Sequence, residues 1–163
     1  MVSGEYAWGS TSITEATSIT NDGTVSERGQ AGSNITYNNT GAVQGPTRVG
    51  SYGSGAMTRP AAGAGYYGAM DLSGNVWEML VTVGESTGRL FDGNINGDGV
   101  LDTSGNGNQN TWPPPAATGA GLRGGSFENT SLYTSTSSRY LVTNVPSSRL
   151  ASSGGHGVRS AGP

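Results

Sequence analysis

The sequence contains neither cysteine nor lysine, and each absence excludes a class of chemistry. Without cysteine, the chain can form no disulfide bond, no thiolate metal site and no cysteine nucleophile. Without lysine, its eight basic residues are all arginines, which lie singly along the chain, and the net charge at pH 7 is −3. Because nucleic-acid-binding proteins carry a basic patch, the sequence predicts no nucleic-acid partner.

Hydrophobic residues are also scarce, at 33% of 163 residues. No stretch approaches the roughly 20 apolar residues of a transmembrane helix, so we expect no membrane insertion. Gly, Ser, Thr, Asn and Pro make up more than half of the chain and favour turns and caps over long helices. This composition argues against a helical bundle, and the length predicts a single domain over residues 1–163.

Short strands between long loops are the secondary structure that the pattern predicts, with one or two short helices at most. Residues rich in β-formers predict a strand at Val76–Val83. The preceding Asp71–Asn75 has the composition of a turn, in which glycine and asparagine permit left-handed backbone. A second short strand is expected at Thr47–Tyr52, and the polar runs Asn21–Gly45 and Phe91–Pro115 are expected to be surface loops.

Few large side chains are available for a hydrophobic core in so polar a chain. Aromatic residues bury the largest areas and so should dominate that core. The predicted core residues are Trp8, Tyr66, Trp77, Trp112, Leu122 and Val158.

Five segments resemble, in the same order, motifs of the formylglycine-generating-enzyme family. Tyr67–Glu78 is similar to the motif GLYDMxGNVWEW, Tyr6–Gly9 to YPWG and Val49–Tyr52 to VGSF. Arg123–Phe127 is similar to RGGSW, and Gly154–Arg159 to GFRGVR. The resemblance covers most of the chain and implies an α+β, C-type-lectin-like fold with short strands, few helices and much irregular loop. Within it, the acidic Asp71 and Glu78 are candidate ion-pair partners of Arg123, Arg139 or Arg159.

The catalytic residues of that family are missing, so we expect no enzymatic activity. The formylglycine-generating enzymes need active-site cysteines and copper, and this chain has no cysteine. Relatives that use non-haem iron need several histidine ligands, whereas His156 is the only histidine here.

One segment has the spacing of a calcium-binding loop. The ligand positions would be filled by Asn94, Asn96, Asp98 and Asp102, with Gly99 permitting the sharp turn. Alternating oxygen side chains can point into one ring around the ion. Two of these positions are neutral and no EF-hand glutamate follows, so the alternative is an ordinary Asn/Gly turn without calcium.

Residues 123–159 form a candidate variable ligand-binding region. Most residue types at eleven of its positions arise when the adenines of an asparagine codon are randomised, although Glu128 does not belong to that set. These positions are Phe127, Glu128, Tyr133, Tyr140, Leu141, Leu150, Ala151, Ser152, Ser153, Gly155 and His156. In this the chain resembles the variable proteins of diversity-generating retroelements, which belong to the same subtype of the C-type lectin fold.

That resemblance implies a non-enzymatic protein that recognises a protein or glycan ligand on a host or environmental surface, as part of a virion or cell surface. A site that accepts many side chains should be exposed, because surface substitutions change stability little. Tyrosine and serine would give it an adaptable contact surface. The alternative is a structural or adhesive domain of the same family without diversification.

Overall fold

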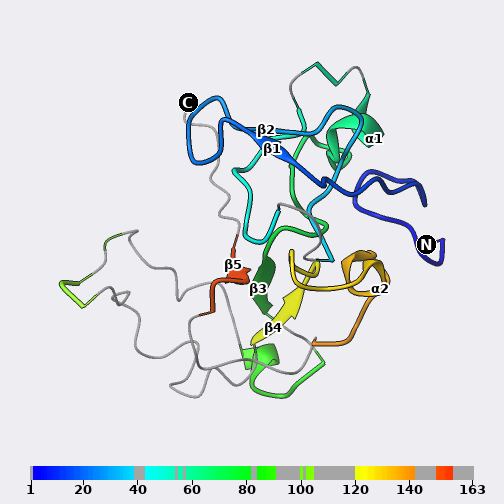
Figure 1. The fold of residues 1–163 in the computed structure, drawn as a ribbon. Helices are drawn as coiled ribbons and strands as arrows, with labels where there is room; N and C mark the ends of the chain where they lie inside the picture. Colours follow the sequence, from blue (N-terminus) through cyan, green and yellow to red (C-terminus); the bar gives the residue numbers. More distant parts are fainter. Residues whose placement is uncertain are drawn as a thin grey trace, which may run out of the picture. The chain divides into compact units, whose positions relative to one another are not determined.

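Short elements joined by irregular backbone make up the described part of the protein (Figure 1). The computed structural model describes residues 2–38, 43–53, 55–56, 58–81, 84–90, 100, 102–104, 120–141 and 150–155. Its contacts divide the chain into two units, of residues 1–78, 123–140 and 150–163, and of residues 79–122 and 141–149. The predicted mixture of much irregular loop, short strands and few helices is confirmed, and no specific fold is identified from it.

The described elements are brief, and none exceeds five residues. In chain order they are β1 (Ile19–Thr20), β2 (Arg28–Gly29), α1 (Arg59–Ala62), β3 (Trp77–Val81), the 3-10 helix η1 (Gly88–Leu90), β4 (Ala120–Arg123), α2 (Ser131–Thr134) and β5 (Ser153–Gly154). In the described part of the chain no helix has the length and hydrophobicity needed to cross a membrane.

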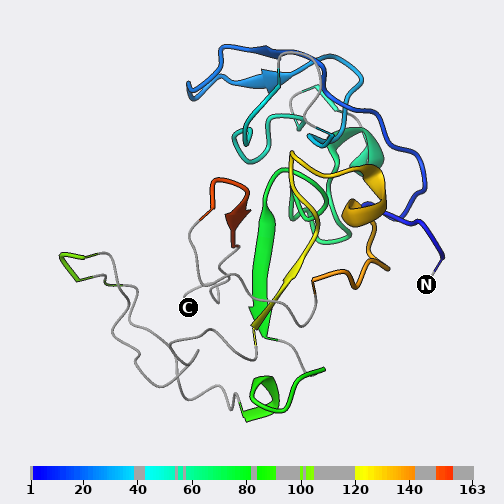
Figure 2. The same ribbon diagram turned by 60° about the horizontal axis from the view of Figure 1, so that its bottom comes forward.

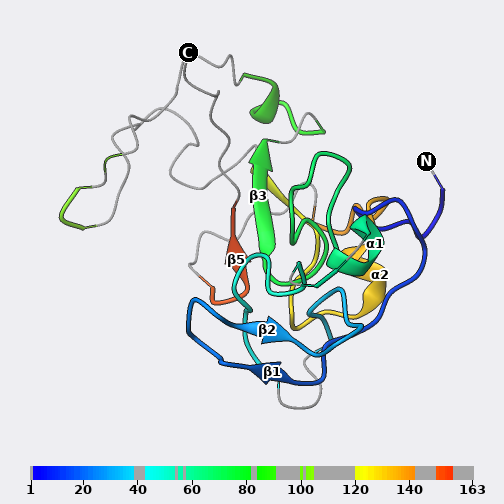
Figure 3. The same cartoon turned by 90° about the horizontal axis from the view of Figure 1, so that it is seen from above.

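The strands form two small sheets. β1 and β2 pair antiparallel, with Ile19 opposite Gly29. The second sheet has the order β4-β3-β5, and its strands can be followed in Figures 2 and 3. β5 runs parallel to β3, with Trp77 opposite Ser153, so that the end of the chain pairs with a strand from its middle.

The strand predicted at Val76–Val83 is confirmed as β3, over Trp77–Val81. The strand predicted at Thr47–Tyr52 is wrong. There the chain makes two consecutive turns, in which Ser51 N donates to Arg48 O and Gly53 N donates to Gly50 O. Ser51 N and Gly53 N are therefore used within local turns, while the side chain of Asn75 bonds both backbone groups of Thr47.

The predicted left-handed turn before β3 is also confirmed. Gly74 and Asn75 have φ angles of 77° and 63°. A side chain at position 74 would collide with the carbonyl oxygen of Thr36 and with Ile35. Glycine is therefore required here both by its backbone angle and by the close approach of another segment.

The buried apolar residues form small clusters, of which one contains Tyr6, Trp8 and Ile35 and another contains Ala16, Val43 and Tyr52. Tyr6 and Trp8 stack with their ring centroids 5.1 Å apart. Of the predicted core residues, Trp8, Trp77 and Leu122 are buried. Trp112 and Val158 lie outside the described residues.

Tyr66 was predicted to be a core residue, and this is wrong because 75% of its surface is exposed. The segment of which it is part forms a tight turn, in which Gly68 N donates to Gly65 O. The turn projects the Tyr66 and Tyr67 side chains outward.

The prediction of a surface loop at Asn21–Gly45 is confirmed for most of its described residues and wrong for a buried part of it. It contains the buried side chains of Glu27, Ile35 and Val43. The Glu27 carboxylate accepts hydrogen bonds from Arg48 N at 2.5 Å, Gly23 N at 2.9 Å and the Ser51 hydroxyl at 3.0 Å. A polar segment is thus buried because its polar groups find partners inside the protein.

Candidate functional site

Asn75 connects several buried segments by hydrogen bonds, and we call these segments, around Thr36, Thr47 and Asn75, the framework. Its side chain bonds the backbone of Thr47 twice, accepting from the N–H at 2.8 Å and donating to the carbonyl at 2.9 Å. Its own N–H donates to Thr36 O, and its carbonyl accepts from Phe127 N, each at 2.8 Å. One residue in left-handed backbone therefore joins three segments that are distant in sequence.

Two consecutive glycines connect β4 to the predicted variable region. Gly124 and Gly125 have φ angles of 89° and 74°. A Cβ atom at position 125 would lie 2.7 Å from Thr134 Cγ2, so the chain can pass α2 only without a side chain there. After this turn the buried Ser126 hydroxyl donates to Asn129 Oδ1 at 2.7 Å. The start of the region is therefore held in one conformation.

Most of the described members of the eleven-residue set are accessible to solvent. Exposed positions are Glu128, Tyr140, Leu150, Ala151 and Gly155, and half-buried ones are Tyr133, Leu141 and Ser153. Tyr140 exposes 67% of its surface and Leu150 exposes 49%. His156 lies outside the described residues.

Phe127 and Ser152 are exceptions to the expectation that the eleven positions are exposed. Phe127 is only 4% exposed, because its N–H bonds Asn75 and its ring is enclosed beside that framework. Ser152 is 6% exposed, and its carbonyl accepts a hydrogen bond of 2.7 Å from Trp77 N next to the β3–β5 pair. Both residues belong to the framework and not to the surface.

A row of three aromatic rings leads from the framework to that surface, and we call it the aromatic row. The Trp77 and Tyr133 ring centroids lie 6.4 Å apart, and those of Tyr133 and Tyr140 lie 4.7 Å apart. Trp77 is buried, Tyr133 is half-buried and Tyr140 is exposed. The exposed Tyr140 ring thus packs on the half-buried Tyr133 ring, which packs on the buried Trp77, and this support limits the freedom that Tyr140 would lose on binding.

Leu150 is presented by a turn that precedes β5. Ser153 N donates to Leu150 O at 3.1 Å, and the neighbouring Ala151 is exposed as well. The pairing of Ser153 and Gly154 with β3 holds the C-terminal side of this turn. The turn can therefore vary at its exposed positions while its backbone stays attached to the sheet.

The structure also exposes a second group of aromatic residues, which the sequence patterns did not predict. Tyr66 and Tyr67 pack edge to face with ring centroids 4.9 Å apart, and the Arg59 guanidinium lies 5.2 Å from the Tyr66 centroid. The glycines on either side, Gly65 and Gly68, could have predicted from the sequence a turn that exposes both rings.

The ion pairs predicted for Asp71 with Arg123 or Arg139 are not formed. The Asp71 carboxylate accepts from Gly50 N at 2.9 Å. Both arginines instead donate to the carbonyl oxygen of Thr136, Arg123 through Nη2 and Arg139 through Nη1. The predicted partner Arg159 lies outside the described residues.

Two of the described ionisable side chains have pKa values that follow directly from their surroundings. Burial raises the pKa of Glu27, but the hydrogen bonds from Arg48, Gly23 and Ser51 outweigh this and leave the pKa below its usual value. Burial lowers the pKa of Arg123, and the positive charge of Arg139 acts in the same direction.

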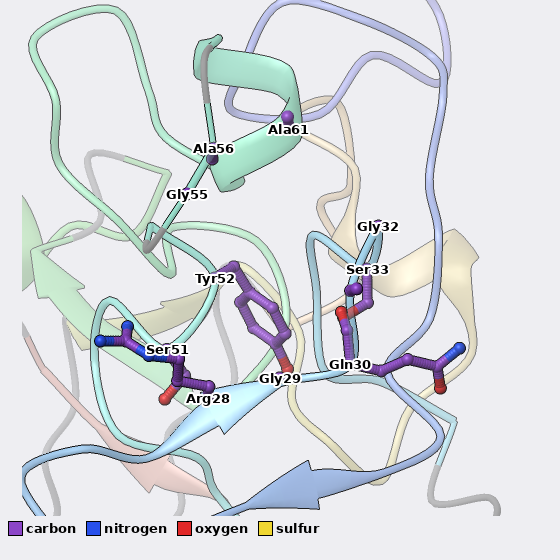
Figure 4. Close-up of a pocket in the computed structure, with 11 residues that line it drawn as sticks. Arg28, Gly29, Gln30, Gly32, Ser33, Ser51, Tyr52, Gly55, Ala56 and Ala61 are labelled. Carbon is purple, nitrogen blue, oxygen red and sulfur yellow. The ribbon is translucent and has the colours of Figure 1, made fainter.

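A cavity of about 310 Å³ lies beside β2, and Figure 4 shows the Tyr52 ring pointing toward Gly29 within it. A side chain on Gly29 would collide with this ring. The Tyr52 hydroxyl is engaged by Thr36, so it is not free for a ligand. Among the described residues that line this cavity, Arg28 is charged, and none carries a carboxylate or an imidazole.

The predicted calcium loop falls mostly outside the described residues, which include Asp102 alone of its four proposed ligands. The Asp102 carboxylate accepts a hydrogen bond of 2.8 Å from Ser104 N. Elsewhere in the part of the chain that the structure describes, no three acidic or histidine side chains lie close enough together to hold a metal ion.

Comparisons with known proteins identify no relative: no protein-family model, curated protein or solved structure matches this chain.

Proposed function

We propose that this chain is a non-enzymatic ligand-binding protein with a C-type-lectin-like fold of the formylglycine-generating-enzyme type. In this proposal a retroelement diversifies its C-terminal surface, which binds a protein or glycan on a host or environmental surface. The motif resemblances and the absence of the family's catalytic cysteines support this assignment.

The aromatic row is the observation that carries the proposal. Tyr140 exposes two thirds of its surface, yet its ring lies 4.7 Å from that of Tyr133, which in turn contacts the buried Trp77. Large aromatic side chains on a rigid support are typical anchors of binding surfaces, because they bury much area at low entropic cost. Leu150 and Ala151 add apolar area on a turn held by β5.

The burial of Phe127 and Ser152 narrows the proposed variable set. These two positions hold framework contacts, so substitutions there would change folding as well as binding. The set that remains within the described residues is Glu128, Tyr133, Tyr140, Leu141, Leu150, Ala151, Ser153 and Gly155. His156 and the calcium loop remain predictions.

A binding screen tests the proposed surface. The wild-type protein is applied to an array of host-surface glycans and proteins, and each hit is repeated with the double variant Tyr140→Ala, Leu150→Ala. Loss of hot-spot anchors is expected to weaken binding about tenfold or more. The control is Tyr67→Ala, which removes an even more exposed tyrosine outside the predicted set. Equal binding by all three proteins would contradict the proposal.

Diversification has its own test in the nucleotide sequence around the coding region. We expect a near-identical template repeat that differs only at adenines, beside a reverse transcriptase. A neighbourhood with neither would favour the alternative, a structural or adhesive domain without diversification. The buried positions in the eleven-residue set are the observation that favours this alternative.

A further inference from the structure

A second cavity, distinct from the aromatic row, lies where β4 ends. Its volume is about 270 Å³, and its lining includes Ala7, Tyr66, Leu72, Arg123, Ser135 and Thr136. None of these residues belongs to the predicted variable set. This volume lies just below the range of common small-molecule sites, roughly 300–1,000 Å³.

The walls of this cavity are held firmly in place. Thr136 donates to Glu5 O through both its N–H and its hydroxyl, each at 2.8 Å. On the other side, Ala7 N donates to the Ser73 hydroxyl at 3.2 Å. The carbonyl of Gly124, which follows Arg123, accepts a hydrogen bond of 2.8 Å from Gly74 N. The cavity therefore needs no large rearrangement to receive a ligand.

Two guanidinium groups lie close together beside this cavity, whose lining includes Arg123 but not Arg139. Arg123 and Arg139 donate to the same carbonyl, that of Thr136, and neither forms an ion pair within the described residues. Arg123 Nε is buried and has no hydrogen-bond acceptor. Like charges held this close repel each other, and a buried donor without an acceptor costs free energy. An anion beside the two guanidinium groups would relieve the repulsion.

The rest of the lining is suited to an apolar group. Ala7 and Leu72 offer aliphatic surface, and the exposed Tyr66 ring lines the same cavity with Arg59 against its face. The space exceeds what a single inorganic anion needs, since one water occupies about 30 Å³ in the liquid. The ligand that fits this combination has one negative charge and a compact apolar body.

We propose that this cavity binds a small organic carboxylate, whose charged group faces Arg123 and whose apolar body lies against Ala7, Leu72 and Tyr66. The Ser135 and Thr136 hydroxyls already donate to the carbonyls of Leu132 and Glu5, so Arg123 is the group that recognises the carboxylate. This site lies outside the proposed variable surface, so either can exist without the other.

The experiment is an NMR titration of the ¹⁵N-labelled full chain with benzoate, and with benzamide as a neutral molecule of the same shape. We expect benzoate to shift the amide signals of Gly124 and Thr136 with a millimolar dissociation constant, and benzamide to bind at least about tenfold more weakly. Arg123→Gln should reduce the affinity for benzoate by a similar factor, because it removes the charge. Arg139→Gln, a change at an exposed side chain, should reduce it several-fold.

Arg28→Gln is the matched control, since Arg28 is an exposed arginine that lines the other cavity. Circular dichroism establishes that each variant is folded. If Arg123→Gln is not, Arg139→Gln and the benzamide comparison still decide the matter. Equal affinity for benzamide, equal loss in Arg28→Gln, or the absence of shifts at Gly124 and Thr136 would each overturn the proposal. Sulfate binding as tightly as benzoate would overturn the assignment to an organic carboxylate.

Discussion

The segments around Thr36, Thr47 and Asn75 differ from the surface formed by Tyr140 and the Leu150 turn in how they are stabilised. In the first region, which we call the polar framework, buried side chains bond the backbone of distant segments. At the surface, Tyr140 rests on one neighbouring ring, and the turn is closed by one backbone hydrogen bond.

The comparison shows how a chain with few hydrophobic residues can be stable. Among the described residues, buried polar side chains are as numerous as buried hydrophobic ones. Each buried polar group needs a partner, so the polar framework tolerates little substitution. The surface residues make fewer contacts, which leaves them open to change.

The largest expected effect comes from disrupting the polar framework where Gly74 lies against the backbone of Thr36. Gly74→Ala should lower the free energy of unfolding by about 3 kcal/mol or more, through positive φ and a collision with Thr36. Urea unfolding measures this loss. The control is Gly68→Ala, where φ is 82° but nothing lies within 4 Å, so only about 1 kcal/mol is expected. Equal losses in both variants would show that the close approach contributes nothing.

An intermediate effect is expected from Glu27→Gln, and it should depend on pH. At neutral pH the variant should lose about 1–3 kcal/mol, because the carboxylate accepts three hydrogen bonds that a neutral amide replaces poorly. Since the pKa of Glu27 is lowered by folding, its ionised form stabilises the protein above the unfolded pKa. That stability is lost as the pH falls through the folded pKa.

Urea unfolding at a series of pH values from neutral to acidic checks this sign. The difference between wild type and Glu27→Gln should shrink as the solution becomes more acidic. Glu128→Gln changes an exposed carboxylate and should alter stability by no more than about 0.5 kcal/mol. A difference between wild type and Glu27→Gln that stays constant with pH would contradict the hydrogen-bonding explanation.

The smallest effect is expected at the surface. Tyr140→Ala and Leu150→Ala should each cost about 1 kcal/mol or less. Tyr140 is mostly exposed and loses only its contact with Tyr133, and Leu150 exposes about half of its surface. Thermal melting of the single variants tests this, and in a chain of this length each kcal/mol corresponds to about 2–4 °C. A fall of many degrees in either variant would place its side chain in the core.

Local features of the fold could be predicted well. β3 was expected from a run of β-formers, and the left-handed turn from the glycine and asparagine before it. Both depend on residues adjacent in sequence, so the pattern is sufficient. The strand expected at Thr47–Tyr52 failed because local turns and the side chain of the distant Asn75 take the backbone hydrogen bonds that a sheet would have used.

The candidate site could be predicted only in part. Residue types indicated the surface that contains Tyr140 and Leu150, but not that Phe127 and Ser152 lie buried beneath it. Their burial follows from backbone bonds to Asn75 and Trp77, which composition does not encode. The cavity at Arg123 could not be predicted either, since its walls come from four separate parts of the chain.

The sequence alone excludes thiol and lysine chemistry, limits the hydrophobic core and locates the turn at Gly74, because these depend on composition or on neighbouring residues. Only the tertiary structure decides which polar side chains are buried and which arginines lack an acidic partner. Glu27 bonds Arg48, and Asn75 bonds Thr47, across 21 and 28 residues. A polar side chain can be satisfied by water or by protein, and the choice depends on which distant backbone groups folding brings within hydrogen-bonding distance.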